Sequence, residues 1–168
     1  MPTEFRRRQF ILASAALAAQ FTALKTIDAR GNLVLPGMIN THTHAAMTVF
    51  RGLGDDVPDR LRRFIFPLEK NLMNREFVHW GGLHGVVEMI EGGVTTMVNS
   101  YYFEEEFAAV VKKAGMRAVL GQTVINFPAP DAPEPYGGLA LAKKFATAWR
   151  GDPLITPAIS PHAPYTVD

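Results

Sequence analysis

The sequence contains no cysteine among its 168 residues. Disulfide bonds, thiolate metal ligands and a cysteine nucleophile are therefore excluded. The sequence also has little net charge, because 17 Lys and Arg side chains nearly balance 16 Asp and Glu side chains. A surface that follows a phosphate backbone needs an excess of positive charge, so we expect no nucleic-acid partner.

Long apolar runs are absent too: none reaches the roughly 20 residues that cross a bilayer, and we expect no membrane segment in the mature protein. The first residues instead combine a charged head at Arg6–Arg8 with a short apolar run, which is typical of a secretory signal peptide. The order Arg7-Arg8-Gln9-Phe10-Ile11-Leu12 resembles the twin-arginine export signal of bacteria. We expect residues 1–20 to be such a signal and the mature protein to be periplasmic. The alternative is a basic amphipathic first helix.

Strands and helices alternate after residue 20. We expect residues 21–36 to form a linker and a β-hairpin that turns at Arg30-Gly31-Asn32. Apolar runs predict strands at 37–43, 94–100, 117–124 and 154–160. Helices are predicted at 61–72, 75–91, 104–114 and 139–150, with Phe77 and Trp80 as core residues of the second.

This alternation predicts an α/β fold with a parallel sheet. Four βα units are half of a TIM-type (β/α)8 barrel, which needs roughly 250 residues when complete. We therefore predict that residues 37–168 are the N-terminal half of such a barrel, preceded by the hairpin as a remnant of a small β-domain. Its first and fourth strands would then have unpaired edges. The alternative, an open doubly wound sheet, lacks a glycine-rich phosphate loop after the first strand.

Two histidines, His42 and His44, lie at the end of the first predicted strand. Residues i and i+2 of a strand point to the same face, so both imidazoles should project together. Two neutral imidazoles at the carboxyl end of a buried strand form half of a metal site. The plainer interpretation is a pair of exposed loop histidines.

Four motifs carry a resemblance to the amidohydrolase superfamily: Pro36-Gly37-Met38-Ile39-Asn40-Thr41-His42-Thr43-His44, Arg51-Gly52, Pro67-Leu68-Glu69 and Ser160-Pro161-His162-Ala163-Pro164-Tyr165-Thr166. More narrowly, the sequence resembles the aminohydrolase branch that contains the S-adenosylhomocysteine and methylthioadenosine deaminases, with the triazine chlorohydrolases nearby. The resemblance runs from about Ile27 to Asp168.

The resemblance implies a role for each matching residue. His42 and His44 would bind one divalent ion, Zn or Fe. Glu69 would bind substrate at the mouth of the pocket, and His162 would donate a hydrogen bond to the substrate. Without the family context, Glu69 would be a solvated helix acid and His162 a turn residue. No Lys occurs in residues 154–165, which favours the single-metal type.

The resemblance also implies that further residues are needed. A third metal-binding His, the catalytic Glu, a second catalytic His and a metal-binding Asp would come from strands five to eight. We therefore expect no catalytic residue in this chain and place those groups beyond residue 168. On this interpretation the chain is truncated and inactive alone, and it needs a C-terminal half or self-association.

The predicted function is hydrolysis of a C–N bond in an amino-substituted heterocycle of the purine or pterin type, through a metal-bound hydroxide. Gln122 lies where the homocysteine-recognising deaminases have an Arg, which argues against a carboxylate-bearing nucleoside. Two alternatives stay open. One is a non-catalytic half-barrel module that needs a partner chain, and the other is a hydrolytic dechlorinase.

Overall fold

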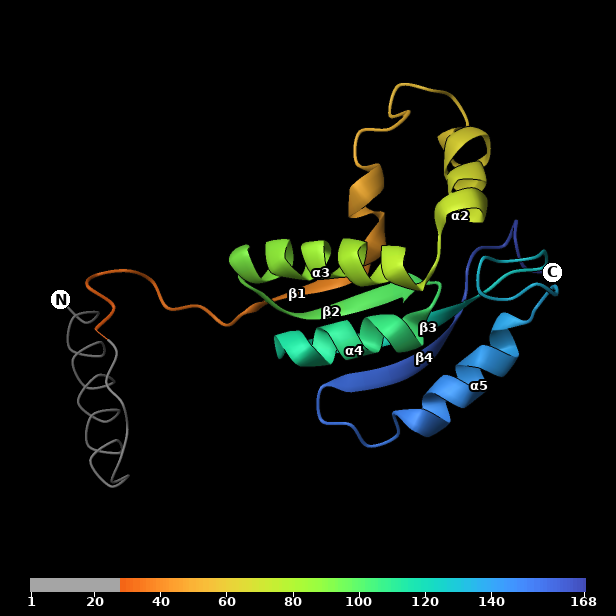
Figure 1. Cartoon of the computed structure of the whole chain (residues 1–168). Coiled ribbons are helices and arrows are strands. Elements are labelled where there is room, and N and C mark those ends of the chain that lie inside the picture. Colours follow the sequence, from red (N-terminus) through yellow and green to blue (C-terminus); the bar gives the residue numbers. More distant parts are fainter. Residues whose placement is uncertain (1–27) are drawn as a thin grey trace. The chain divides into compact units, whose positions relative to one another are not determined.

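The computed structural model describes residues 28–168 (Figure 1). The predicted export signal at residues 1–20 and the first part of the predicted linker lie outside the described residues. The chain divides into two units between Pro36 and Gly37, and the second unit contains every helix and strand among the described residues.

Four parallel strands form a single sheet in the order β1-β2-β3-β4. Their bounds are β1 Met38–Thr43, β2 Val94–Tyr101, β3 Arg117–Val124 and β4 Ile155–Pro161. All four predicted strands are confirmed. Because the spatial order follows the chain order with no reversal, the sheet has the arrangement of a barrel half and lacks the switch point of a doubly wound fold.

Helices occupy each connection between strands (Figure 1). They are η1 Ala45–Phe50, η2 Leu61–Ile65, α2 Phe66–Leu72, α3 Arg75–Glu91, α4 Glu104–Ala114 and α5 Gly138–Ala148. The predicted helix at 61–72 is one π-helical segment, η2, that continues into α2. The 3-10 helix η1 directly after β1 was not predicted, because its six residues are too few for a periodic pattern.

The helix ends show why these segments begin and stop where they do. Asn74 caps α3 by accepting a hydrogen bond of 2.9 Å from the backbone N–H of Phe77. Gly115 ends α4 with a φ of 77°, the left-handed conformation that glycine adopts without a steric penalty. Glu104 lies in the first turn of α4, where an acid complements the helix dipole, but it has no exposed surface. It belongs to a buried network described below.

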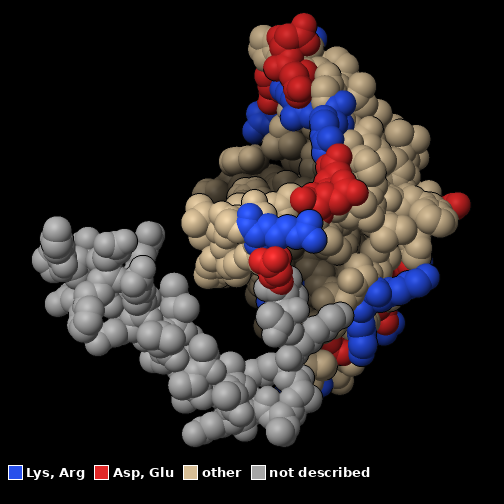
Figure 2. Space-filling model, turned by 90° about the vertical axis from the view of Figure 1, so that its left-hand side faces the viewer, with Lys and Arg blue, Asp and Glu red and all other residues tan. Residues whose placement is uncertain are grey.

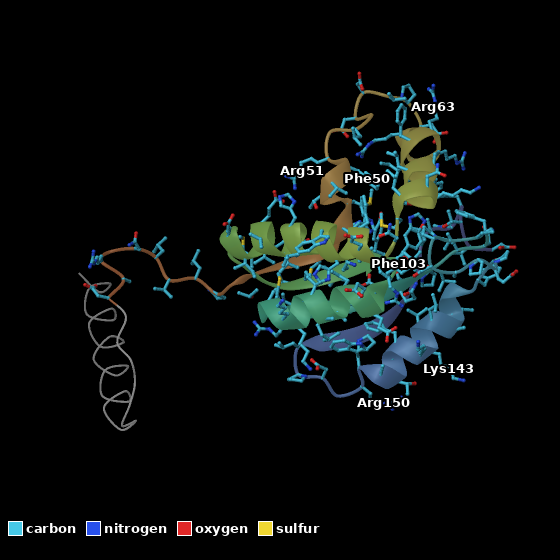
Figure 3. All side chains as sticks on the ribbon, in the orientation of Figure 1. Phe50, Arg51, Arg63, Phe103, Lys143 and Arg150 are labelled. Carbon is cyan, nitrogen blue, oxygen red and sulfur yellow. The ribbon has the colours of Figure 1, made fainter. Side chains whose placement is uncertain are left out.

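The core lies between the sheet and helices α3, α4 and α5. Phe50 of η1 points into it, while Arg63, Lys143 and Arg150 extend outward (Figure 3). Phe77, predicted as a core residue, is half-buried and packs against the core, with its ring centroid 5.1 Å from that of Phe50.

Trp80, by contrast, is 62% exposed, and its prediction as a core residue is wrong. The reason is that the buried face of α3 contains Gly81, Gly82 and Gly85. A pattern of large apolar side chains does not reveal a helix face made of glycine.

The hairpin predicted before the sheet is observed only in part. Its turn is present, because the backbone N–H of Asn32 donates to the carbonyl of Ala29 at 2.8 Å. No strand is found among residues 28–36, and Leu33 is 88% exposed. An isolated two-stranded hairpin is marginally stable, so a turn without pairing is the expected result when no third strand supports it.

β1 and β4 are the edges of the sheet within the described residues. Apolar side chains on both edge strands stay accessible: Ile39 of β1 is 64% exposed and Ile159 of β4 is 57% exposed. These are the unpaired edges expected of a barrel half.

Basic and acidic side chains lie near each other on the face shown in Figure 2. The ion pairs of the described residues include Arg51–Glu88 and Lys112–Asp152. Between residues 28 and 168, no helix combines the length and apolar character needed to cross a membrane.

Candidate functional site

The carboxyl ends of the strands bring the predicted site residues together. A cavity of about 90 Å³ is lined by His44 after β1, Ser100 of β2, Glu69 of α2 and His162 after β4. A second cavity of about 450 Å³ adjoins it and is lined by His42 as well as by His44 and His162. The structure therefore places all four predicted residues around two adjoining cavities.

The two ring Nε2 atoms of His42 and His44 face each other at 3.3 Å. Nδ1 of His44 lies 2.5 Å from the carbonyl oxygen of Ser100. A carbonyl oxygen can only accept, so Nδ1 carries the proton and Nε2 keeps its lone pair. Two imidazole ligands of a tetrahedral zinc ion, each with a Zn–N distance of about 2.0–2.1 Å, have their nitrogens about 3.3 Å apart. The pair therefore has the geometry of two ligands to one such ion.

The backbone of β1 explains why the pair converges. The register between β1 and β2 shifts between Asn40 and Thr43, where three residue steps of β1 span two steps of β2. Such a bulge changes the direction in which nearby side chains point. Asn40 also fixes the bulge by accepting a hydrogen bond of 3.2 Å from the backbone N–H of His42.

The environment of His44 favours the neutral ring. Burial lowers its pKa, an effect opposed by the hydrogen bond to Ser100 and assisted by the nearby His42. Neutral imidazole is the form that binds a metal ion.

Glu69 is buried, with only 5% of its surface exposed, so it is not a solvated helix acid. The hydroxyl of Tyr101 donates to its Oε1 at 2.7 Å. Burial raises the pKa of Glu69 to about 7, and hydrogen bonds from Tyr101 and Tyr102 oppose that rise. Neither tyrosine was predicted as a site residue from the sequence. Their position in the sequence could have indicated a role in the site, because Tyr101 ends β2 and Tyr102 follows it.

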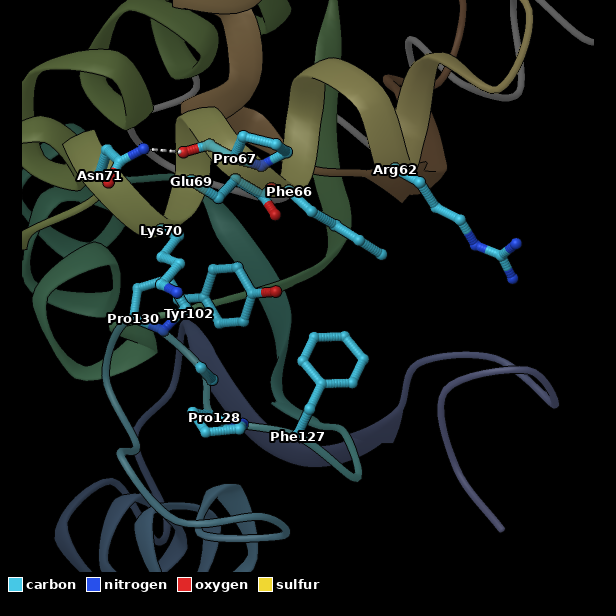
Figure 4. Close-up of a pocket in the computed structure, with 11 residues that line it drawn as sticks. Arg62, Phe66, Pro67, Glu69, Lys70, Asn71, Tyr102, Phe127, Pro128 and Pro130 are labelled. Carbon is cyan, nitrogen blue, oxygen red and sulfur yellow. Dashed lines mark hydrogen bonds between the residues drawn. The ribbon is translucent and has the colours of Figure 1, made fainter.

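A larger cavity of about 770 Å³ is also lined by Glu69 (Figure 4). It shares Phe66, Glu69 and Tyr102 with the small cavity beside His44. The rings of Phe66 and Phe127 lie 5.7 Å apart at its wall. Its other lining residues are Arg62, Pro67, Lys70, Asn71, Pro128, Ala129 and Pro130. Aromatic and proline side chains thus dominate this cavity, and Arg62 and Lys70 add positive charge.

His162 is held in a turn and also faces the cavities. Its backbone N–H donates to Val124 at 3.1 Å, and its Nδ1 lies 2.9 Å from the hydroxyl oxygen of Thr166. That hydroxyl donates its own proton to the carbonyl of Ala163 at 3.1 Å, so it accepts from Nδ1. Nε2 of His162 is then the atom left to meet a ligand, as an acceptor in the neutral ring and as a donor in the protonated ring. Burial and the neighbouring His44 lower the pKa of His162.

Gln122 does not line any of these three cavities. It is buried, and its Nε2 donates to Asp131 at 2.8 Å.

In residues 28–168 there is no cluster of three or more His, Cys, Asp or Glu side chains arranged to hold a metal ion. Within this part of the chain, His42 and His44 are a pair without a third such ligand.

Comparison with known proteins finds relatives that are named as deaminases. The chain is 46% identical over 149 residues to a 5-methylthioadenosine/S-adenosylhomocysteine deaminase of Syntrophus aciditrophicus, a match that covers 88% of this chain and 34% of the relative. It is 42% identical over 144 residues to a 5'-deoxyadenosine deaminase of Methanocaldococcus jannaschii, covering 83% of this chain and 34% of the relative.

Among solved structures, an adenosine deaminase from Xanthomonas campestris with bound zinc superposes with a TM-score of 0.76 at 41% identity. That match covers 79% of this chain and 31% of the other. The chain thus spans about a third of the length of the relatives that it matches. Residues 33–168 match the Amidohydrolase family. This match and the barrel-like order of the sheet lead to one conclusion: the chain belongs to the amidohydrolase family.

Proposed function

We propose that this chain provides the first part of the active site of a metal-dependent hydrolase that deaminates an adenine nucleoside or a related amino-substituted heterocycle. The observation that carries this proposal is the pair of Nε2 atoms, 3.3 Å apart, at the edge of cavities that Glu69 and His162 also line. The names of the relatives support it, since they are deaminases of methylthioadenosine, S-adenosylhomocysteine and 5'-deoxyadenosine.

His42 and His44 would hold one divalent ion, and zinc is the first candidate because the related adenosine deaminase structure contains it. The ion would supply Lewis-acid chemistry and would lower the pKa of a water ligand to about 7. Catalytic zinc sites use three protein ligands, so the pair by itself should bind zinc weakly. We propose that a C-terminal half of the barrel, on the same chain or on a second chain, supplies the remaining ligands and the catalytic carboxylate.

The other site residues would bind and orient the substrate. Glu69 lines both the small cavity and the large one, so its carboxyl group can accept hydrogen bonds from hydroxyl groups at the middle of an extended ligand. Tyr101 holds that carboxyl group in place. His162 would meet a polar atom of the heterocycle through Nε2. The heterocycle would lie beside His44, with its substituent in the large cavity.

The lining of the large cavity defines which substrates to assay first. Phe66 and Phe127 suit an apolar substituent such as a thioether. Arg62 and Lys70 lie on the same cavity and suit a carboxylate. We therefore propose parallel assays of methylthioadenosine, S-adenosylhomocysteine and 5'-deoxyadenosine, with ammonia release as the measurement.

Zinc binding by this chain tests the metal site directly. Titration calorimetry of the purified chain should show weak binding that is lost in His42→Ala and in His44→Ala. His84→Ala is the matched control, because His84 is an exposed histidine on α3 that lines none of the three cavities. Equal zinc affinity in the wild type and in both site variants would contradict the proposed metal site.

We also propose that residues 1–20 direct the protein to the periplasm through the twin-arginine pathway. The support is the sequence Arg7-Arg8-Gln9-Phe10, which lies outside the described residues. Cell fractionation after expression in a bacterium with this pathway tests the proposal. The double substitution Arg7→Lys, Arg8→Lys should keep the protein in the cytoplasm, and equal export of both forms would contradict it.

A further inference from the structure

Two consecutive residues of β2 hold the turn that follows β1. The carbonyl oxygen of Ser100 accepts the Nδ1–H of His44 at 2.5 Å. The side-chain oxygen of Asn99 accepts the backbone N–H of Ala45 at 2.8 Å. The ring of His44 and the peptide bond that follows it are therefore both fixed to the same strand.

Asn99 can make its bond in one orientation only. The backbone N–H of Ala45 is a donor, so the amide oxygen of Asn99 must face it. The amide nitrogen then faces Glu104 and donates to its Oε1 at 2.5 Å. Asn99 is 2% exposed and Glu104 has no exposed surface, so water cannot replace either partner. Glu104 thus determines which way the amide of Asn99 points.

Helix α3 closes the turn from the other side. A Cβ atom at Gly85 would lie 2.8 Å from the carbonyl oxygen of Ala45, and one at Gly81 would lie 2.6 Å from that of Ala46. Ala45 and Ala46 are themselves buried, at 2% and 3% exposed. The backbone after His44 is enclosed between β2 and the glycine face of α3.

We propose that Asn99, oriented by Glu104, is a positioning residue that fixes the peptide after His44 and thereby directs Nε2 of His44 toward His42. The pair Asn99–Glu104 acts through the backbone and touches neither cavity-facing nitrogen. The functional meaning of this arrangement rests on the metal-binding role proposed for His44.

The choice of variants separates positioning from general stability. Asn99→Ala removes the contact to Ala45 and leaves a cavity. Asn99→Leu removes the same contact but fills a similar volume. The two variants together test the loss of the amide with and without a cavity. Met97→Ala is the matched control: Met97 lies two positions earlier on the same face of β2 and has no exposed surface. Asn99→Asp is the conservative variant, because it keeps an acceptor for the Ala45 N–H and can share a proton with the carboxyl group of Glu104 in place of the amide N–H bond.

Nuclear magnetic resonance of the histidine rings in the metal-free chain gives the first measurement. His44 should be in the Nδ1–H tautomer in the wild type, in Met97→Ala and in Asn99→Asp. Asn99→Ala and Asn99→Leu should show a mixture of tautomers and faster exchange of the ring proton. Retention of the wild-type tautomer and exchange rate in either folded variant would overturn the proposal, and so would absence of that tautomer in the wild type.

Zinc titration of the same proteins gives the second measurement. Loss of an outer partner of a metal ligand typically weakens metal affinity 10- to 100-fold, and we expect a weakening in this range for Asn99→Ala and none for Met97→Ala. Unchanged zinc affinity in Asn99→Ala would also contradict the proposal. If the wild-type chain binds no zinc, the proposed metal site is wrong, while the ring measurement still decides whether Asn99 positions His44.

Discussion

The hydroxyl of Tyr101 donates a hydrogen bond of 2.7 Å to the carboxyl group of Glu69, and the two side chains are 5% exposed each. Tyr101 comes from the end of β2 and Glu69 from α2, so this bond joins the sheet to the helix that borders both cavities. A carboxyl group removed from water in this way favours its neutral form, because burial penalises the charge more than the two tyrosine hydroxyls compensate for it.

The first prediction concerns the stability of Glu69→Gln at different pH values. The pKa of Glu69 is about 7 in the folded protein, and its ordinary value in water is 4.5. The unfolded chain therefore releases this proton first, so the wild type loses stability as the pH rises from about 4.5 to 7. Gln does not titrate. The stability of Glu69→Gln relative to the wild type should rise over this interval by on the order of 3 kcal/mol.

Urea unfolding of both proteins at pH 5 and pH 8 measures this difference. Glu76→Gln serves as the control, because Glu76 is an exposed acid in the first turn of α3. Its stability should follow the wild-type curve at both pH values. Parallel curves for Glu69→Gln and the wild type would show that Glu69 is not held in the buried, neutral state.

The second prediction concerns Tyr101→Phe. In the wild type, the hydroxyl of Tyr101 lowers the pKa of Glu69. Removal of this hydroxyl should therefore raise that pKa further. A buried group that loses a partner costs about 1–3 kcal/mol, and the cost is larger when the group is charged. Tyr101→Phe should therefore destabilise the protein more at pH 8 than at pH 5. Tyr165→Phe, at a position 59% exposed, should leave the free energy of unfolding unchanged at both pH values.

The sequence predicted the sheet and most helices well because local signals and the tertiary fold agree in these segments. The strand at Arg117–Val124 and the helices at Arg75–Glu91 and Glu104–Ala114 have the predicted bounds. Gly115 provides the helix stop that its position predicts. His42 and His44 could be selected as a pair because a strand places residues i and i+2 on one face.

Other features depend on contacts between distant segments, which no local pattern contains. Tyr101 becomes part of the site only because α2 brings Glu69 against the end of β2. Asn99 and Glu104 are five positions apart, but their role depends on Ala45, which lies 54 positions away from Asn99. The second phenylalanine of the large cavity, Phe127, comes from the proline-rich loop after β3.

The third prediction concerns Phe127→Ala and the large cavity. The ring of Phe127 pairs with that of Phe66, and both line the space proposed for the substituent of the substrate. Burial of an aromatic ring against an apolar group contributes about 1–2 kcal/mol of binding. In the complete enzyme, Phe127→Ala should raise KM for methylthioadenosine about tenfold with little change in kcat.

The comparison variant for this measurement is Phe64→Ala. Phe64 lies in η2, is 38% exposed and does not line the large cavity. Its removal should leave KM unchanged. A fall in kcat with constant KM for Phe127→Ala would show that the ring acts on the reacting centre and not on the substituent.

The fourth prediction concerns Gly85→Ala, which tests how closely α3 approaches the turn after His44. Alanine is the better helix former by about 1 kcal/mol, so propensity alone predicts stabilisation. The added Cβ, however, would lie 2.8 Å from the carbonyl oxygen of Ala45, which is backbone and is held by its neighbours. Overpacking of this kind costs about 1–3 kcal/mol, so the net effect should be destabilising.

Urea unfolding would measure the change in the free energy of unfolding. Val87→Ala, at a position 44% exposed on the same helix, is the reference. A stabilised Gly85→Ala would mean that the turn can move away from α3, and then Asn99 alone would have to hold the peptide after His44.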